Sequence, residues 1–252
     1  MLRTAVRVAA ASAAASALLS ASALAQGKFP PDSATNLQVL PDDIPMRQLI
    51  GTMQNFTRAL GVRCTFCHVG QEGQPLSTYD FASDRKPEKE TARRMMQMAA
   101  AINGEYLAKL ASRSEPRVEV TCMTCHRGVS QPRPLQQVLL AKYDAGGIDS
   151  VETLYRSLRQ RYYGAAAYDF GEGSLADVAS ALRARDRLDD AIRVHALNTE
   201  FAPTSAFAFR QAAEAYLAKG DTVTAIARLE KALSINANDQ QAKRMLDALR
   251  KP

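Results

Sequence analysis

Apolar residues recur at spacings of three and four along most of this chain, a pattern that predicts helices rather than strands. A first helix is predicted between Pro45, which suits a first turn, and Gly61, which suits a helix end. Its apolar face carries Met46, Leu49, Ile50, Met53, Phe56 and Leu60. A second run begins at Pro87 and is predicted to end at Asn103-Gly104.

The two predicted helices show the same order of residues. The aligned pairs are Met53 with Met95, Phe56 with Met98, Leu60 with Ile102, and Gly61 with Asn103. This register indicates a duplicated unit. The copies differ in the connection from the helix to the next cysteine, because two residues separate Gly61 from Cys64 whereas 18 residues separate Asn103 from Cys122.

The second half of the chain contains a repeat. Ala191-Ile192 and Ala225-Ile226 lie 34 residues apart, which is the tetratricopeptide period. Helix-like runs precede them at 175–184 and 206–218, and a closing helix is predicted at about 239–249. Such repeats bury their apolar faces only by stacking, so we expect a further helix over 150–163 to complete the stack.

Two five-residue segments carry the candidate chemistry. They are Cys64-Thr65-Phe66-Cys67-His68 and Cys122-Met123-Thr124-Cys125-His126. The spacing is typical of c-type haem attachment, because two thiols three positions apart can add to the porphyrin vinyl groups while the next imidazole faces the iron. We therefore predict two covalently bound haem c groups, with the four cysteines as attachment points and His68 and His126 as iron ligands.

The same cysteines also suit three other kinds of site. Four thiolates can bind zinc, a Cys-x-x-Cys pair can act as a redox dithiol, and four sulfurs can form two disulfides. The residue count favours haem, since all four Cys and two of the three His lie inside the two segments. We expect the third, His195, to be a packed or surface residue.

Methionine thioethers are the candidates for the sixth iron ligands, because only one histidine lies outside the two segments. Met53 is the candidate for the first haem, with Met46 as its alternative. For the second haem the helix offers Met95, Met96 and Met98. The duplicated register selects Met95 among them, although methionines at helical spacing are also typical of core packing.

Residues 51–68, 93–96 and 120–128 resemble the cytochrome c subunit of bacterial photosynthetic reaction centres. The resemblance covers about residues 36 to 140. In that family each haem packs along the helix that precedes its binding motif, and that helix usually donates the methionine ligand. The resemblance therefore implies Met53 and Met95 in these roles. The family carries four haems, one with a second histidine ligand, whereas this chain has two motifs and is not tied to photosynthesis by them.

The first 25 residues predict a secretory signal peptide. Arg3 and Arg7 flank an apolar run that closes in Ala23-Leu24-Ala25 before Gln26. No later segment approaches 18 apolar residues, so we expect a periplasmic protein after cleavage. Members of the family are often lipid-anchored, but no lipid anchor is expected here because no cysteine is left to carry one.

The positive charge does not predict a nucleic-acid partner. The formal charge is +6, and removal of the signal peptide leaves an excess confined to residues 26–142, with 15 basic and 11 acidic residues, against 15 of each in residues 143–252. The propionates of two haems would largely cancel that excess, so steering by net charge should be weak.

These observations predict an all-α protein: a multihaem c-type cytochrome module with little regular sheet, followed by a tetratricopeptide-like module. The expected division is a signal peptide at 1–25, a dihaem domain at 26–142, a linker and helix at 143–168, and repeats at 169–252. The predicted function is electron carriage between redox proteins, not enzymatic catalysis, with the repeats docking a protein partner. The alternatives are a dihaem peroxidase-like enzyme, which needs an open sixth position, and a redox-dependent adaptor.

Overall fold

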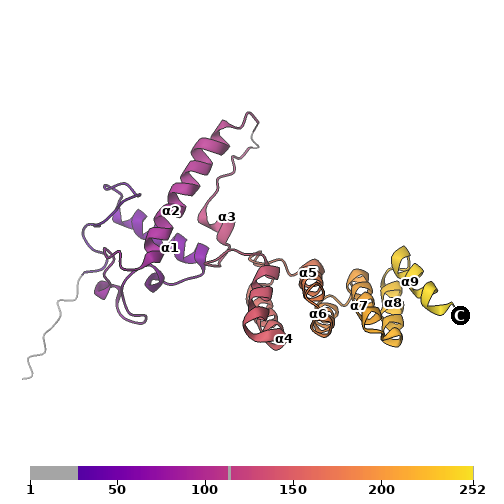
Figure 1. Ribbon diagram of the computed structural model, residues 1–252. Coiled ribbons are helices and arrows are strands. Elements are labelled where there is room, and N and C mark those ends of the chain that lie inside the picture. The colour runs from indigo at the N-terminus through magenta and orange to yellow at the C-terminus, as the bar shows by residue number, and fades with distance from the viewer. Residues whose placement is uncertain (1–27, 113–114, 252) are drawn as a thin grey trace, which may run out of the picture.

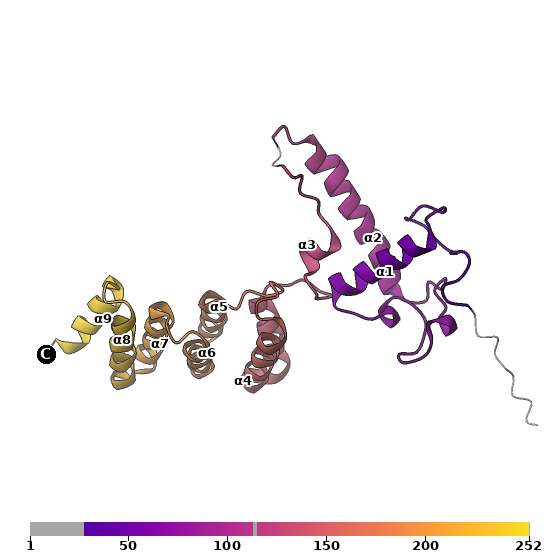
Figure 2. The same cartoon turned by 180° about the vertical axis from the view of Figure 1, so that it is seen from behind.

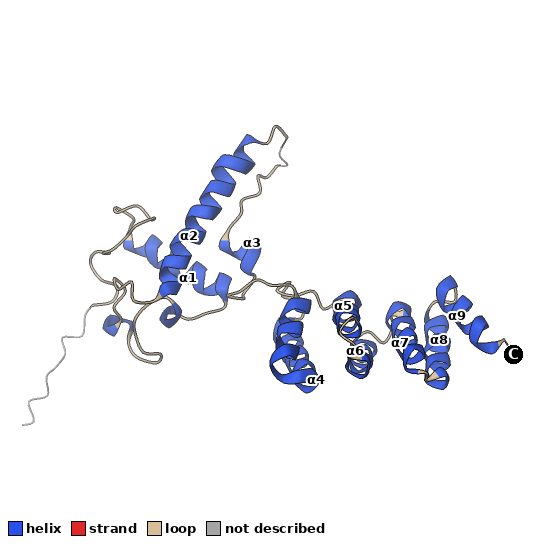
Figure 3. Ribbon diagram, in the orientation of Figure 1, coloured by secondary structure: helices blue, strands red, loops and turns tan. Residues whose placement is uncertain are grey.

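The structure is a computed structural model that describes residues 28–112 and 115–251, and its regular elements are helices (Figures 1 and 3). This confirms the predicted all-α class. Within the described residues, strand-type pairing is limited to one isolated bridge between Val69 and Asp80. The predicted signal peptide at 1–25 lies outside the described residues. In the described part of the chain, no helix is long and apolar enough to cross a membrane.

The N-terminal part is built on α1 (Met46–Leu60) and α2 (Pro87–Ala101), as the apolar periodicity predicted. Gly61 ends α1 in a left-handed conformation, with φ of 65°, and its N–H donates to the Thr57 carbonyl oxygen. The helical backbone that begins with α2 extends further than the predicted end at Asn103-Gly104. A π-helical turn at Ile102–Tyr106 and a 3-10 turn at Leu107–Lys109 follow, because Gly104 does not adopt the left-handed conformation that stops a helix.

Beyond these turns the chain reverses and returns along α2 to α3 (Cys122–His126), as both views show (Figures 1 and 2). The helix α4 (Leu135–Tyr162) comes next and is interrupted at Gly147, whose φ of 67° and ψ of −170° are non-helical. Leu135 and Leu139, from the first part of α4, lie in the same apolar core as α5 and α6. These two residues thus pack with the helical module, although they precede the predicted boundary at 142.

Five helices complete the chain and stack in sequential order (Figure 1). They are α5 (Glu172–Arg183), α6 (Leu188–Phe201), α7 (Ala206–Lys219), α8 (Thr222–Ile235) and α9 (Gln240–Arg250). Two antiparallel pairs with a closing helix are what the 34-residue period predicted. The side chains of Ser205, Asp221 and Asp239 accept backbone N–H bonds at the starts of α7, α8 and α9.

The second part of α4 packs against this stack, as expected for a helix that completes it. Val151 and Tyr155 are fully buried in the core shared with α5 and α6, and the Tyr155 ring meets those of Phe170 and Phe201 edge to face. His195 of α6 is buried, with 3% of its surface exposed, so the expectation of a packed or surface residue resolves to a packed one.

Candidate haem-binding site

The first Cys-x-x-Cys-His segment follows directly from the end of α1. Cys64–Phe66 form a 3-10 turn, and the His68 N–H donates to the Cys64 carbonyl oxygen at 3.0 Å. This turn brings both thiols and the imidazole within a single turn of backbone. Cys64 and Cys67 are half-buried, and burial raises the pKa of the Cys67 thiol.

The second segment is the short helix α3. Thr121 and Thr124 form a capping box at its start, which satisfies the first N–H groups of the turn. Because Cys125 and His126 are three and four positions after Cys122, all three lie on one face of the helix. Burial raises the pKa of the Cys122 thiol.

The C-terminal end of α1, which leads into the first segment, contacts the chain that follows the second segment. The Gly128 N–H donates to the Ala59 carbonyl oxygen at 2.8 Å. A Cβ on Gly61 would fall 2.0 Å from the Gly128 carbonyl oxygen, so only glycine permits this approach. The structure therefore places both predicted haem-binding segments at the C-terminal end of α1, which their separation in the sequence did not indicate.

Both histidines are suited to metal ligation. The His126 Nδ1 atom bonds the Val129 carbonyl oxygen at 2.9 Å, which places the proton on Nδ1 and leaves the Nε2 lone pair for a metal. Among the described residues, the buried Nδ1 atom of His68 has no hydrogen-bond partner. Burial lowers the pKa of His68, with Lys89 contributing, so the neutral imidazole that a metal needs is the favoured form.

The His68 ring is held by a loop that sequence reasoning did not single out. Phe81 meets it edge to face, with ring centroids 5.0 Å apart. Lys89 on α2 donates to the carbonyl oxygens of Phe81, Ala82 and Ser83 at 2.9 to 3.0 Å. Three backbone acceptors on one ammonium group fix the loop, so α2 positions the surroundings of the first segment.

A second basic residue of α2 holds the same loop. The buried Arg93 donates to Asp84 at 2.9 Å and to the Asn36 carbonyl oxygen at 3.2 Å. The bond from Arg93 holds the pKa of the Asp84 carboxyl well below its usual range. The spacing of Lys89 and Arg93, four residues apart on one helix face, was the available sequence signal.

The candidate methionines lie on the predicted helices. Met53 is half-buried on α1, while Met95 and Met98 are exposed on α2 and Met96 is half-buried. Their assignment as iron ligands remains a prediction, as does the choice of Met95 over its neighbours.

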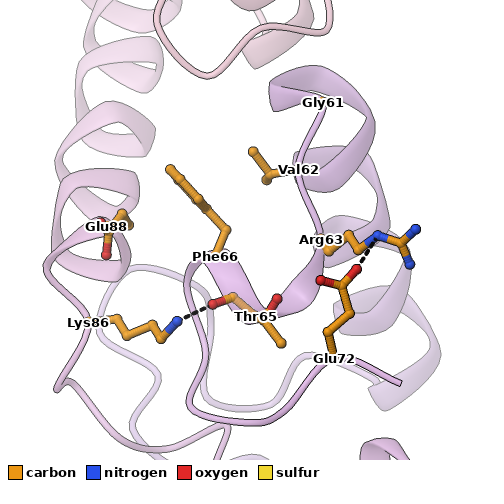
Figure 4. A pocket seen from close by; sticks show the side chains of 8 residues that line it. All are labelled: Gly61, Val62, Arg63, Thr65, Phe66, Glu72, Lys86 and Glu88. Carbon is orange, nitrogen blue, oxygen red and sulfur yellow. Dashed lines mark hydrogen bonds and ion pairs between the residues drawn. The ribbon is translucent and has the colours of Figure 1, made fainter. Parts of the chain in front are cut away.

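A cavity of about 530 Å³ opens beside the first segment, between the end of α1 and the start of α2 (Figure 4). Val62 and Phe66 point into it, while Lys86 donates to the Thr65 carbonyl oxygen at its floor. A second cavity of about 480 Å³ is lined by Cys125 and Arg127 and by the segment that leads into α5. Each cavity thus adjoins one of the two segments.

The donor set and its surroundings fit haem better than the alternatives. Among the described residues no three or more His, Cys, Asp and Glu side chains are grouped as metal ligands, and the four cysteines form no disulfide. The pKa values of Cys67 and Cys122 are raised, whereas a reactive dithiol has a lowered one. Large apolar side chains also stand exposed in and near the segments: Phe66, Met95, Met98 and Met123.

Comparison with known families gives the same assignment. Residues 36–144 match the family described as "Photosynthetic reaction centre cytochrome C subunit". This range agrees with the resemblance seen in the sequence motifs.

Two relatives illustrate the match. The chain is 31% identical to cytochrome c-554 of Chloroflexus aurantiacus over 99 aligned residues. The aligned part is 36% of this chain and 22% of that protein. Over 90 residues it is 33% identical to the photosynthetic reaction center cytochrome c subunit of Thermochromatium tepidum, which covers 32% of this chain and 21% of the relative. The chain thus spans about a fifth of the length of these relatives.

Solved structures are similar to this chain in helical arrangement alone. The type III secretion translocator chaperone SycD of Yersinia enterocolitica aligns with a TM-score of 0.32 at 18% identity, over 46% of this chain and 89% of that one. The assignment of tetratricopeptide-like repeats rests on the helix pairs of this chain and their period. Residues 36–144 are therefore similar to the cytochrome c subunit of photosynthetic reaction centres, and a tetratricopeptide-like helical module completes the chain.

Proposed function

We propose that this protein is a periplasmic dihaem c-type cytochrome that carries single electrons between redox proteins. The observation that carries the proposal is the pair of Cys-x-x-Cys-His segments, which both adjoin the C-terminal end of α1 within the part of the chain similar to reaction-centre cytochromes, and which each present two thiols and an imidazole. Haem bound at these segments would supply a ferrous and ferric couple, and no substrate would be transformed.

The residues of this chain have distinct roles in the proposal. Cys64 and Cys67 hold the first haem and Cys122 and Cys125 the second, each pair through two thioether bonds. His68 and His126 would ligate the irons, and His126 would do so through Nε2 because its Nδ1 atom bonds the Val129 carbonyl oxygen. The Val129 carbonyl oxygen orients His126, and a hydrogen bond of this kind raises the basicity of a ligating imidazole.

Met53 and Met95 are proposed as the sixth ligands. A thioether in that position raises the reduction potential relative to a second histidine. Occupation of the sixth position by methionine also distinguishes an electron carrier from a peroxidase-like enzyme, which needs that position open.

The helical module from residue 135 onward is proposed to dock a protein partner. Stacked helical repeats present extended surfaces to other proteins. The Arg127 side chain donates to the Ala166 carbonyl oxygen at 3.1 Å, which links the chain after the second haem-binding segment to the connection between α4 and α5 of this module. A partner docked on the repeats would therefore be held close to the second haem.

A redox titration with optical detection, combined with intact mass, tests the function. Protein purified after secretion from a host that attaches haem to cysteines should carry the mass of two haems and titrate in two one-electron steps. A colourless protein with the mass of the bare polypeptide would contradict the proposal.

Replacement of the sixth ligand separates the carrier from the enzyme. Met53→Ala should abolish the methionine–iron charge-transfer absorption of one haem, whereas the control Met46→Ala, about two helical turns away, should retain it. A carrier should show no peroxide turnover in the wild type. Substantial turnover there would favour the peroxidase-like alternative.

A further inference from the structure

The two haem-binding segments are connected to their helices in different ways. After α1 the chain reaches Cys64 through Gly61, Val62 and Arg63 alone. After α2 the residue in the position of Gly61 is Asn103, and the residue two before Cys122 is Val120, as Val62 is two before Cys64. Residues 104–119 are thus an insertion between two positions that are adjacent in the first copy.

The side chain of Asn103 closes this insertion. Its Nδ2 atom donates to the Val120 carbonyl oxygen at 2.8 Å, and its Oδ1 atom accepts the Val120 N–H at 2.8 Å. Both bonds are partly buried, and together they satisfy both backbone groups of one residue. A primary amide matches this pattern because it offers a donor and an acceptor on one planar group.

The rest of the segment is held independently of Asn103. The capping box of Thr121 and Thr124 folds the turn itself, and the bond from Gly128 to Ala59 fixes the end that follows His126. Asn103 therefore holds the other end, where the segment meets α2.

We propose that Asn103 is a positioning residue, which gives the second haem-binding segment the same relation to its helix that chain continuity imposes on the first. The inference rests on the proposed function, because the helix and the segment would supply the methionine and the cysteine and histidine ligands of one haem. It also means that the insertion at 104–119 is not itself needed for haem placement.

Loss of the amide should loosen one haem and leave the other unchanged. In Asn103→Ala we expect two attached haems by mass, loss of the methionine–iron absorption of one haem, and a lowered potential for that haem alone. Asn103→Asp, which can accept from the Val120 N–H but cannot donate while ionised, should give an intermediate shift. Asn55→Ala is the control, because Asn55 is an exposed residue of α1 whose side chain bonds the exposed Arg58 side chain.

A splice tests the same idea by putting direct chain continuity in place of the two Asn103 hydrogen bonds. Replacement of residues 103–120 by Gly-Val reproduces the junction of Leu60-Gly61-Val62 in the second copy. The spliced protein should retain both haems and both methionine–iron absorptions, whereas loss of those features in the splice would show that the insertion, not the closure at Asn103, places the segment.

Hydrogen exchange at the Val120 amide reads the closure directly in the haem-loaded protein. Exchange should be slow in the wild type and at least tenfold faster in Asn103→Ala. Unchanged exchange, or unchanged potentials and absorption in Asn103→Ala, would overturn the inference. Failure of the proposed function gives a different result, since the wild type itself would then carry no haem.

Discussion

Residues 28–134, which hold both Cys-x-x-Cys-His segments of the proposed cytochrome domain, and the helical module at 135–251 differ in how they are stabilised. Within the described residues, the buried apolar side chains of the first region are only Ala59 and Val129, whereas the second region contains two continuous apolar cores. The helical module buries its apolar faces against its own chain. The cytochrome domain keeps large apolar side chains at its surface around the two haem-binding segments.

Polar contacts fix the positions of several segments in the cytochrome domain. Lys89 and Arg93 fix the loop at 81–84, and Asn103 fixes the chain at Val120. A hydrogen bond stabilises a protein by only about 1 kcal/mol net, so such contacts define positions better than they drive folding. The difference teaches that the first region buries little apolar surface against its own chain, and the proposed function accounts for this because a covalently attached porphyrin would supply the apolar contact.

Removal of the attachment thiols should give the largest effect and tests this comparison directly. Replacement of all four cysteines by alanine should leave residues 28–134 without a cooperative unfolding transition, because no apolar partner is then held. Residues 135–251 should unfold as in the wild type. Limited proteolysis with mass spectrometry would follow both regions.

Two outcomes would break the comparison. A protease-resistant cytochrome domain in the cysteine-free protein would show that the domain has a sufficient core of its own. Joint loss of both regions would show that the helical module depends on the haem-loaded domain.

A smaller effect is expected from acidification of the helical module. Burial lowers the pKa of His195 from 6.5 to about 4, with Arg183 contributing, so the folded state disfavours the charged imidazole. Below pH 6.5 the unfolded state therefore binds more protons at His195 than the folded state does. The free energy of unfolding of the helical module is at its full value above pH 6.5 and decreases as the pH falls toward 4. The loss should be about 2 kcal/mol between pH 7.5 and 5.

Denaturant unfolding of the helical module at the two pH values measures this loss. His195→Gln, which does not titrate, should remove most of the pH dependence in that window. If the unfolding free energy of the wild type and of His195→Gln changed equally between the two pH values, the loss would come from other groups.

An effect of similar size is expected at the contact between Gly61 and Gly128. Gly61→Ala and Gly73→Ala both place a side chain at positive φ, with values of 65° and 84°. A Cβ on Gly61 would meet a backbone oxygen, whereas a Cβ on Gly73 would meet no atom within 4 Å. Gly61→Ala should therefore lower the free energy of unfolding by about 2 kcal/mol more than Gly73→Ala. Denaturant midpoints of the haem-loaded cytochrome domain compare the two variants, and equal midpoints would deny this contact a structural role.

Much of the local structure could be predicted from the sequence. The apolar spacing of three and four located α1 and α2, and the 34-residue period located the helix pairs from α5 to α8. The end of the helical run after α2 could not be predicted, because a glycine ends a helix only when it adopts the left-handed conformation, and Gly104 does not. The role of Asn103 was also hidden, since its partner Val120 lies across the insertion.

The sequence by itself determined the chemistry of the candidate site, because the order of two thiols and an imidazole is a local property of each five-residue segment. Only the tertiary structure decided that Gly61, before the first segment, contacts Gly128, after the second. It also decided that α2 fixes the loop beside His68 and that the first part of α4 packs with the helical module. Contacts of this kind join residues far apart in the chain and depend on how the helices pack, which no local spacing encodes.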